Sequence, residues 1–493
     1  MTALSMQAIE LTYILAWHAE NKVEGVAYRL GEQVLSWREL DQQSDVRAAA
    51  LAAYGVEHDH LVAISLPNGP DFIASIFAVW KCGATPLPLS PHLAPEECRT
   101  ILELGQARVY IAPQPCPGST VPHLPGNFGS DAPAPRGRTT TTHWKACTSG
   151  GSTGRPKIIV DHRPGAFSPD TAMFFLPRDG VVLNTAPLYH NGPFSAVNLA
   201  LFKGCTVIDM RRFDAEHVLQ LIEQHRVAWM YLVPTMMHRI WQLGDEVRGR
   251  YDVSSVKMAF HTAGPIPRWL KQAWIQWLGP DHIGEVYGAT EGLGRTWISG
   301  REWLERPGSV GQISGGAKLR ILAPDGSDCA SGDVGEVFLL PPDGPGTTYH
   351  YLGATARRTA DGWESVGDLG WLDDAGYLYL ADRRDDMIIC GGVNIYPAEV
   401  EAALLAHEQV ASAVVIGLKD DEYGQRVHAV VQRRAAALSA EDLRNYLSGH
   451  LVPIKVPKSF EFVDHPVRDD AGKVRRSAMR GARDDAAGRG TSA

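Results

Sequence analysis

The chain has 493 residues with a net charge of −9, and 44% of its residues are hydrophobic. This length supports two or three domains with buried cores, and the negative charge argues against nonspecific nucleic-acid binding. The most apolar stretch, at 73–80, is too short to cross a bilayer. The seven cysteines are scattered without a C-x-x-C pair, and the eighteen histidines show no metal-ligand spacing. We therefore expect a cytoplasmic protein with reduced thiols, no nucleic-acid partner and no membrane span.

Strands alternate with amphipathic helices in the first half of the chain, which predicts a mainly parallel α/β sheet. A loop at 113–142, rich in Pro, Gly, Ser and Thr, interrupts the pattern. Predicted strands lie at 26–30, 33–37, 61–65, 107–112, 181–183, 229–233 and 256–260, and predicted helices at 37–54, 70–81, 94–104, 215–225 and 267–278.

After that loop, residues 149–157 combine three glycines, three hydroxyls and two cations. Bare amides, hydroxyl donors and positive charge can converge on a polyphosphate, so this stretch is a candidate phosphate loop. Its flanks predict a strand-loop-strand, unlike the strand-loop-helix of a Walker loop, whose Gly-Lys-Ser/Thr ending is also absent. The candidate residues are Ser149, Gly150, Gly151, Ser152, Thr153, Gly154 and Lys157.

Two other interpretations of this loop remain open. Gly150, Ser152 and Gly154 match the G-x-S-x-G nucleophile elbow of serine hydrolases, which requires a strand-to-helix turn. Pro156 and the strand-like residues 158–160 argue against that helix. The second alternative is a Gly/Ser surface hairpin without a ligand.

Two later loops combine small residues with an aromatic ring, a hydroxyl and a carboxylate. Small residues permit a flat base to approach the backbone, and Tyr287 could stack on its other face. Thr290 and Glu291 could serve a phosphate and its magnesium, because hard cations prefer oxygen ligands. The residues of these loops are Ala263, Gly264, Pro265, Tyr287, Gly288, Thr290 and Glu291.

Past residue 310 the sequence predicts a small β region, followed by a small α+β unit. The strands are expected at 317–322, 335–340, 413–418, 427–431 and 460–463, and the helices at 398–407 and 440–447, the second capped by Ser439. Residues 481–493 contain almost no apolar bulk, which predicts a disordered tail.

The loop at 149–157 resembles, without a gap, the phosphate loop of the adenylate-forming superfamily, which comprises acyl-CoA synthetases, adenylation domains and luciferases. Six motifs follow the family's order, including Y-G-x-T-E at 287–291 and a run at 382–401 similar to coenzyme A ligases. The resemblance covers essentially the whole chain. It implies an N-terminal domain, residues 1–384, for ATP and the acid, and a mobile C-terminal domain, residues 385–493.

The resemblance also implies catalytic roles. Lys473 and Thr153 would act on the phosphates, and Glu291 would bind Mg2+. His190 would gate the acid and thiol channels, although a histidine beside Gly and Pro in a loop is more often structural. The implied acyl pocket consists of Tyr189, His190, Asn191, Phe194, Thr235 and Met236.

Further roles fall near the domain junction. By the family pattern, Asp368 and Arg383 bind the ribose, since a carboxylate accepts from two adjacent hydroxyls and a guanidinium donates. Asp385 would be the hinge between the domains. Gly391 and Gly392 would line the path of the pantetheine arm.

Together these roles imply a ligase that uses ATP, Mg2+ and coenzyme A. A carboxylate is a poor acyl donor, and transfer of AMP to it makes a mixed anhydride that a thiol can attack. No acidic residue at 189–194, 233–237 or 261–264 would select an ammonium group, so an aryl, alicyclic or fatty acid is favoured. The alternatives are a carrier-protein thiol in trans, a serine hydrolase, and a nucleotide binder without turnover. The oligomeric state, monomer or homodimer, stays open.

Overall fold

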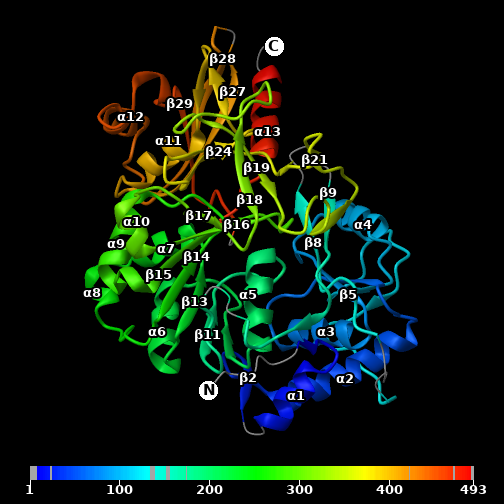
Figure 1. Ribbon diagram of the computed structural model, residues 1–493. Coiled ribbons are helices and arrows are strands. Elements are labelled where there is room, and N and C mark those ends of the chain that lie inside the picture. The colour runs from blue at the N-terminus through cyan, green and yellow to red at the C-terminus, as the bar shows by residue number, and fades with distance from the viewer. Residues whose placement is uncertain are drawn as a thin grey trace.

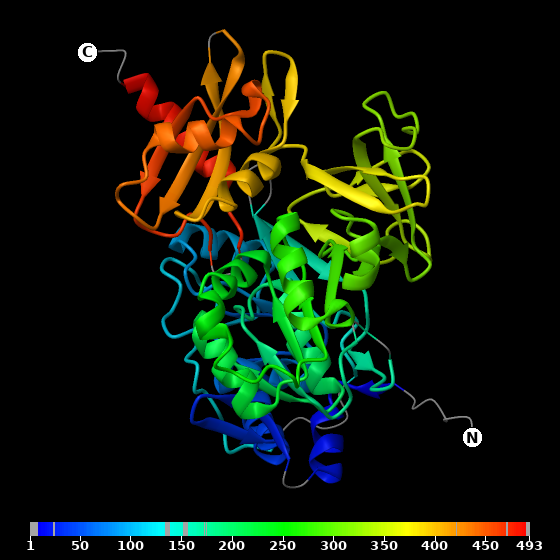
Figure 2. The ribbon, with the colours of Figure 1, turned by 90° about the vertical axis from the view of Figure 1, so that its left-hand side faces the viewer.

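The computed structural model describes residues 8–22, 25–133, 139–150, 156–171, 173, 175–420, 422–469 and 472–489. Gly151, Ser152, Thr153 and Gly154 of the predicted phosphate loop therefore lie outside the described residues. The chain forms a large N-terminal part and a smaller C-terminal unit, which lies on the side opposite α1 (Ile14–Asn21) in Figures 1 and 2.

The first α/β unit is a parallel sheet in the order β5-β4-β6-β7. Helix α2 is capped by Ser36, the residue before its first turn, whose side chain forms a capping box with Glu39. Helix α3 is almost entirely buried and contacts strands of this sheet and of the nine-stranded sheet, so it joins the two. The elements are α2 (Trp37–Ala53), β4 (Leu61–Ile64), α3 (Pro70–Lys81), β5 (Thr85–Pro88), α4 (Pro95–Leu104), β6 (Val109–Ile111) and β7 (His123–Leu124).

The nine-stranded sheet has the order β17-β16-β15-β14-β13-β11-β12-β2-β3, in which the strands from β15 to β2 run parallel. Its strands are β2 (Val26–Leu30), β3 (Gln33–Ser36), β11 (Val181–Asn184), β12 (Thr206–Asp209), β13 (Trp229–Leu232), β14 (Met258–His261), β15 (Ile283–Gly288), β16 (Arg295–Ser299) and β17 (Gln312–Ser314). Its helices are α5 (Asn191–Phe202), α6 (Ala215–His225), α7 (Pro234–Trp241), α8 (Gly244–Arg248), α9 (Arg268–Leu278) and α10 (Gly300–Glu305).

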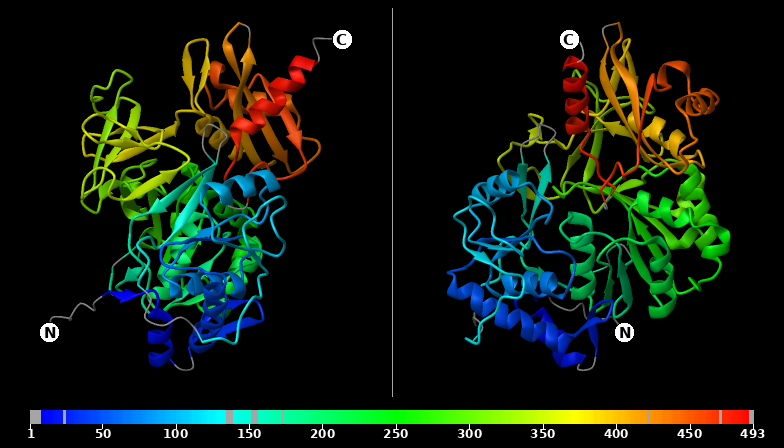
Figure 3. Two further views of the ribbon diagram at one scale, coloured as in Figure 1. Left: turned by 90° about the vertical axis from the view of Figure 1, so that its right-hand side faces the viewer. Right: turned by 180° about the vertical axis from the view of Figure 1, so that it is seen from behind.

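A three-stranded sheet, β20-β9-β8, carries the predicted phosphate loop. Strand β9 contacts α4, and the hairpin of β8 and β9 stands beside that helix in Figure 3. A neighbouring antiparallel sheet forms the predicted β region. The strands are β8 (Ala146–Gly150), β9 (Pro156–Asp161) and β20 (Tyr349–Leu352), then β18 (Lys318–Leu322), β19 (Gly335–Leu340), β21 (Arg357–Arg358), β22 (Glu364–Ser365), β23 (Asp368–Leu372) and β24 (Leu378–Arg383); a separate pair joins β1 (Ile9–Glu10) to β10 (Ala166–Phe167).

The C-terminal unit has its own sheet, β26-β25-β28-β27 with β29 beside β28, and a separate hydrophobic core. Ser439 caps α12 through a capping box with Asp442, as predicted. The elements are β25 (Ile388–Cys390), β26 (Val393–Ile395), α11 (Pro397–Leu405), β27 (Val410–Asp420), β28 (Gly424–Arg433), α12 (Ala440–Ser448), β29 (Ser459–Val463) and α13 (Arg476–Arg489).

The predicted fold class, α/β sheets with a small β region and a small α+β C-terminal unit, is confirmed. The prediction of a disordered tail from residue 481 is wrong as far as Arg489, because α13 continues to that residue. None of the seven cysteines forms a disulfide. Within the described ranges, no helix combines the length and apolar character needed to cross a bilayer.

Candidate active site

Four adjacent parallel strands bring predicted site residues to one edge of the nine-stranded sheet. His190 follows β11, Thr235 follows β13, Ala263 follows β14, and Tyr287 lies at the end of β15. Parallel strands present their carboxyl ends at the same edge, where α/β sheets bind their ligands. The fold thus gathers segments that are far apart in the sequence.

The segment around the phosphate loop is an antiparallel hairpin. Strands β8 and β9 pair with Ser149 opposite Lys157 and Gly150 opposite Pro156. Because a strand begins at Pro156, the helix required after a nucleophile elbow is missing, and the serine hydrolase alternative is not favoured.

Lys157, the second residue of β9, contacts Glu291, the predicted magnesium ligand. Its Nζ lies 3.4 Å from Glu291 Oε1 and donates to the Tyr351 hydroxyl at 2.9 Å. The Tyr351 hydroxyl in turn donates to Glu291 Oε1 at 2.6 Å. Burial, together with the charge of Glu291, raises the pKa of Tyr351, so this hydroxyl keeps its proton.

This arrangement fits a magnesium ion that arrives with a nucleotide. Among the described residues, no three His, Cys, Asp or Glu side chains form a metal cage. None is needed, because Mg2+ commonly binds through one or two carboxylates plus phosphate oxygens. The sheltered carboxylate of Glu291, 7% exposed, beside the cation of Lys157 provides such a position.

Tyr351 was missed by sequence reasoning. It lies 194 residues from Lys157, and nothing in the alternation Tyr349-His350-Tyr351 predicts that β20 would pair with β9. Lys145 was also missed. It is buried, and its Nζ contacts Asn191 Oδ1 and donates to Ser195 Oγ at 2.8 Å.

The residues predicted to bind ribose lie side by side. Asp368 and Arg383 are partners across β23 and β24, with Arg383 Nε 3.4 Å from Asp368 Oδ1. The Tyr287 hydroxyl donates to Asp368 Oδ2 at 2.7 Å. Burial and the charge of Asp368 raise the pKa of Tyr287 well above its ordinary value. A hydrogen bond thus connects Tyr287, the predicted base-stacking ring, directly to Asp368, the predicted ribose ligand.

The turn after β14 leaves its backbone open. Ala263 has a φ of 75°, in the left-handed region that a non-glycine residue seldom adopts. A Cβ on Gly264 would meet no atom of the described residues within 4 Å, and Ala263, Gly264 and Pro265 are all exposed. The side chain of Thr262 donates to Val286 O at 2.8 Å and fixes the turn against β15. Gly288 and Thr290 follow on that strand and its loop.

The predicted catalytic lysine comes from the C-terminal unit and reaches this edge. A Cβ on Gly472 would lie 2.9 Å from Thr235 Oγ1, which places the turn before Lys473 against the segment after β13. Lys473 is exposed, and desolvation of its amine lowers its pKa while the charge of Asp469 opposes the shift. The charge of Lys473 also influences Cys147 in β8.

His190 lies under the same turn. Its Nε2 is 3.9 Å from Asp469 Oδ2, and no hydrogen-bond partner occurs for this atom in the described part of the chain. Burial and the positive charge of Lys473 lower the pKa of His190 to about 3, so the ring is neutral. Buried polar atoms are normally hydrogen-bonded, so this ring nitrogen is a candidate to bond a ligand group.

The six residues of the predicted acyl pocket divide into two sets. Tyr189, His190 and Thr235 lie at the edge of the sheet, with the Tyr189 and His190 rings 4.5 Å apart. The side chains of Asn191, Phe194 and Met236 are engaged with Lys145, with Trp80 and Trp144, and with Thr185, respectively.

The predicted hinge and thiol path lie in the two turns that flank β25. Asp385 is in the turn between β24 and β25, where Arg384 Nε is 3.5 Å from its Oδ1. Gly391 and Gly392 form the turn of the next hairpin, with φ of 56° and 79°. The Gly391 amide donates to Tyr423 O within the C-terminal unit, and within the described ranges no atom would lie within 4 Å of a Cβ on Gly392.

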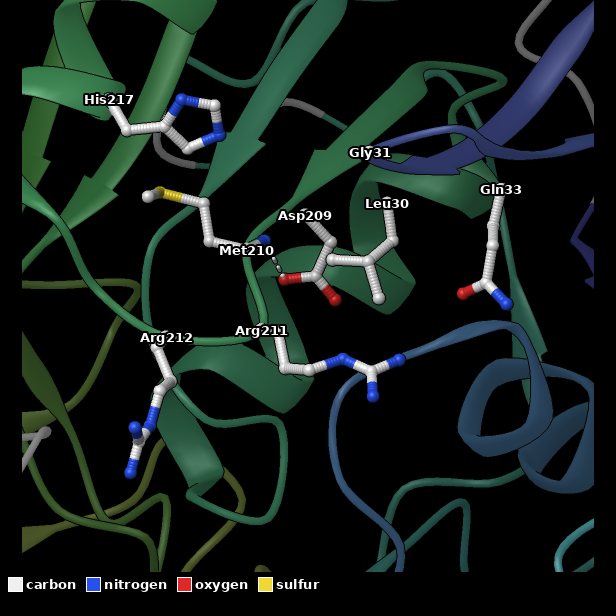
Figure 4. Close-up of a pocket in the computed structure, with 8 residues that line it drawn as sticks. All are labelled: Leu30, Gly31, Gln33, Asp209, Met210, Arg211, Arg212 and His217. Atoms are coloured by element: carbon white, nitrogen blue, oxygen red, sulfur yellow. Dashed lines mark hydrogen bonds between the residues drawn. The ribbon is translucent and has the colours of Figure 1, made fainter.

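A shallow pocket of about 330 Å³ lies elsewhere, between the β2–β3 turn and the end of β12 (Figure 4). Asp209 at its base accepts from Asn184 and from the Met210 amide, and burial raises its pKa to about 6. None of the predicted site residues lines this pocket, so we assign it no part in the chemistry.

The family is established by comparison with known proteins. The chain matches the AMP-binding enzyme family over residues 15–352 and the AMP-binding enzyme C-terminal domain over residues 399–473. It therefore belongs to the AMP-binding enzymes.

Relatives extend over almost the whole chain. An indoleacetate–CoA ligase of Aromatoleum aromaticum is 29% identical, and the alignment covers 96% of this chain and 98% of the ligase. A fatty acid–[acyl-carrier-protein] ligase of Streptomyces coeruleorubidus is 27% identical, with 95% and 96% covered. The structure of Bacillus subtilis o-succinylbenzoate CoA synthetase with an acyl-adenylate intermediate is similar, with a TM-score of 0.81, 25% identity and 96% and 99% covered. The predicted class, an AMP-forming acid–thiol ligase, is confirmed at the level of the family.

Proposed function

We propose that this protein activates a carboxylic acid with ATP as an acyl-adenylate and transfers the acyl group to coenzyme A. The observation that carries the proposal is that Lys473, from the C-terminal unit, lies close enough for its charge to act both on His190, at the edge of the nine-stranded sheet, and on Cys147 in the phosphate hairpin. A cation delivered to that edge is suited to a reaction between two anions.

In the first step the acid oxygen attacks the α-phosphorus and pyrophosphate leaves. The barrier is mainly electrostatic, so the residues contribute positioning and positive charge. We assign this role to Lys157, Lys473 and the loop with Ser149, Gly150 and Thr153. Glu291 would hold Mg2+, which neutralises phosphate charge when bound.

The nucleoside would lie across the carboxyl edge of the sheet. Asp368 and Arg383 would bind the ribose hydroxyls, and Tyr287 would flank the base. The exposed backbone at 263–265 supports this placement, because a Cβ on Gly264 would meet no atom of the described residues within 4 Å, and Gly288 and Thr290 follow on the neighbouring strand and its loop.

The second step requires a different arrangement of the units. We place the boundary between residues 384 and 385 and the pivot at Asp385, in the turn between β24 and β25. Rotation there would remove Lys473 and bring Gly391 and Gly392 to the site, where their lack of side chains would admit a pantetheine arm.

The acid is proposed to be aryl, alicyclic or fatty, since the names of relatives include indoleacetate, o-succinylbenzoate and fatty acids. Coenzyme A is preferred as acceptor, with a carrier protein as the alternative. The free thiols support a cytosolic setting.

A panel of carboxylic acids tests the proposal. Each acid is incubated with MgATP, and pyrophosphate release is followed with coenzyme A, with a loaded carrier protein, or with neither. Acid-dependent release coupled to an acyl-CoA product supports the proposal. ATP binding without pyrophosphate release from any acid would contradict it and favour a binder without turnover.

A further inference from the structure

The pairing of β20 with β9 brings Tyr351 to the root of the phosphate hairpin. Tyr351 is the register partner of Ile159, which lies two residues after Lys157. Residues two apart on a strand share a face, so Tyr351 and Lys157 project to the same side. The Lys157 ammonium lies 4.0 Å from the centre of the Tyr351 ring.

The Tyr351 hydroxyl connects two groups of opposite charge. It has a single proton, which it gives to Glu291 Oε1 at 2.6 Å, and it accepts from Lys157 Nζ at 2.9 Å. Thr348, next to the start of the same strand, donates from Oγ1 to Glu291 O at 2.9 Å. This segment therefore holds both the side chain and the main chain of Glu291.

We propose that Tyr351 is a positioning residue for nucleotide-bound magnesium: its hydroxyl holds one oxygen of Glu291 and leaves the other to the metal. The inference rests on the proposed function, in which Glu291 binds Mg2+. Phosphate would compete with Glu291 for Lys157. The hydrogen bond from Tyr351 then keeps the carboxylate in place.

A second tyrosine on the same strand provides a matched control. Tyr349 packs edge-to-face on Tyr351, with ring centres 4.8 Å apart. Its hydroxyl donates to Glu364 at 2.8 Å, a buried carboxylate also bound by Arg358. Each tyrosine therefore packs on the ring of the other and donates to a carboxylate of its own. Only the carboxylate bound by Tyr351 is the proposed metal ligand.

The test compares Tyr351→Phe with Tyr349→Phe. The affinity for ATP is measured by calorimetry in Mg2+ and in EDTA, and the ratio of the two gives the metal-dependent gain. Losing a hydrogen bond to a metal ligand commonly costs about 10–100-fold in metal affinity. We expect Tyr351→Phe to reduce the gain by that factor and to raise the KM for Mg2+ more than it lowers kcat. Tyr349→Phe should keep the wild-type gain.

A double variant checks that Tyr351 acts through Glu291. In the Glu291→Gln background, adding Tyr351→Phe should have no further effect on the metal-dependent gain. Two results would overturn this inference but leave the proposed function intact, provided that the wild-type protein forms adenylate. In the first, Tyr351→Phe keeps the full metal-dependent gain; in the second, it loses affinity for ATP equally in Mg2+ and in EDTA. If the wild-type protein itself shows no metal-dependent binding of ATP, both the inference and the proposed function fail.

Discussion

Two lysines from distant parts of the chain supply positive charge to the candidate site. Lys157 lies beside Glu291 and Tyr351, so its charge is compensated within the N-terminal part. Lys473 is exposed, yet its pKa is lowered because desolvation of the amine outweighs the charge of Asp469. An anionic substrate at this position would favour the protonated amine.

The lowered pKa of Lys473 predicts how activity depends on pH. Adenylate formation should require the protonated amine, so the rate should fall as pH rises through a pKa below 10.5, the ordinary lysine value. Arginine stays charged throughout this range. Lys473→Arg should therefore abolish the fall in rate at high pH, even if the variant is slower than wild type at every pH. Pyrophosphate release at saturating ATP and acid, measured against pH, checks this. A decline at the same pH in both proteins would assign it to another group.

His190 is predicted to separate the acid and thiol channels. Because its pKa is about 3, its role at neutral pH depends on shape and hydrogen bonding, not on charge. His190→Ala should change the preference among acids, or the ratio of the two half-reactions, by roughly tenfold or more, the scale of a pocket contact. ATP affinity should change little. Wild-type behaviour across the acid panel would instead favour a structural histidine.

At the scale of single residues, the sequence predicted the roles of those site residues that lie in family motifs. Asp368 and Arg383 could be predicted to act together by family resemblance, and they are neighbours across two strands. Tyr351 and Lys145 could not be predicted, because their contacts depend on strand pairing and burial that no local pattern encodes. The roles of the residues in 151–155 remain predictions.

Among the elements, the link between β24 and β25 is where the two units are proposed to rotate relative to each other. Proline fixes φ near −65° and restricts the preceding residue. Asp385→Pro should therefore hold one arrangement of the units, the one in which Lys473 reaches the site. We expect adenylate formation largely to survive, while thioester formation from preformed acyl-adenylate falls steeply. Rapid-quench measurement of each half-reaction gives the result.

Asp385→Ala is the matched control, because it removes the same side chain without restricting φ. It should retain both half-reactions at similar rates. An equal loss of both half-reactions in a folded Asp385→Pro protein, or no loss of either, would remove Asp385 as the hinge.

Elements with a strong local signal were predicted well. Helix α3 has the predicted bounds, and α6 begins where Asp214 accepts from the His217 amide. Helix α13 was missed because its sequence is polar, although its Met479 packs on β27. Tertiary contact thus stabilises a helix that composition alone would assign to a tail.

For the whole molecule, the separate cores of the N-terminal part and the C-terminal unit permit the units to move as bodies. The present arrangement places Lys473 at the site and leaves Gly391 and Gly392 beside Tyr423, within the C-terminal unit. One arrangement cannot serve both proposed roles. The sequence predicted a mobile C-terminal unit that carries Lys473, and in this arrangement the neighbouring Gly472 lies against Thr235 at the candidate site.

The most direct test of the account is acyl-adenylate formation without any thiol, in wild type and in Lys473→Ala. An active acid from the panel is mixed with MgATP, and bound acyl-AMP is quantified by mass spectrometry alongside pyrophosphate. Loss of one transition-state donor typically costs about 10²–10³-fold. We predict a decrease of that size in Lys473→Ala, while Lys455→Ala, which breaks only an ion pair with Glu399, matches wild type. Unchanged acyl-adenylate formation in Lys473→Ala would contradict the account.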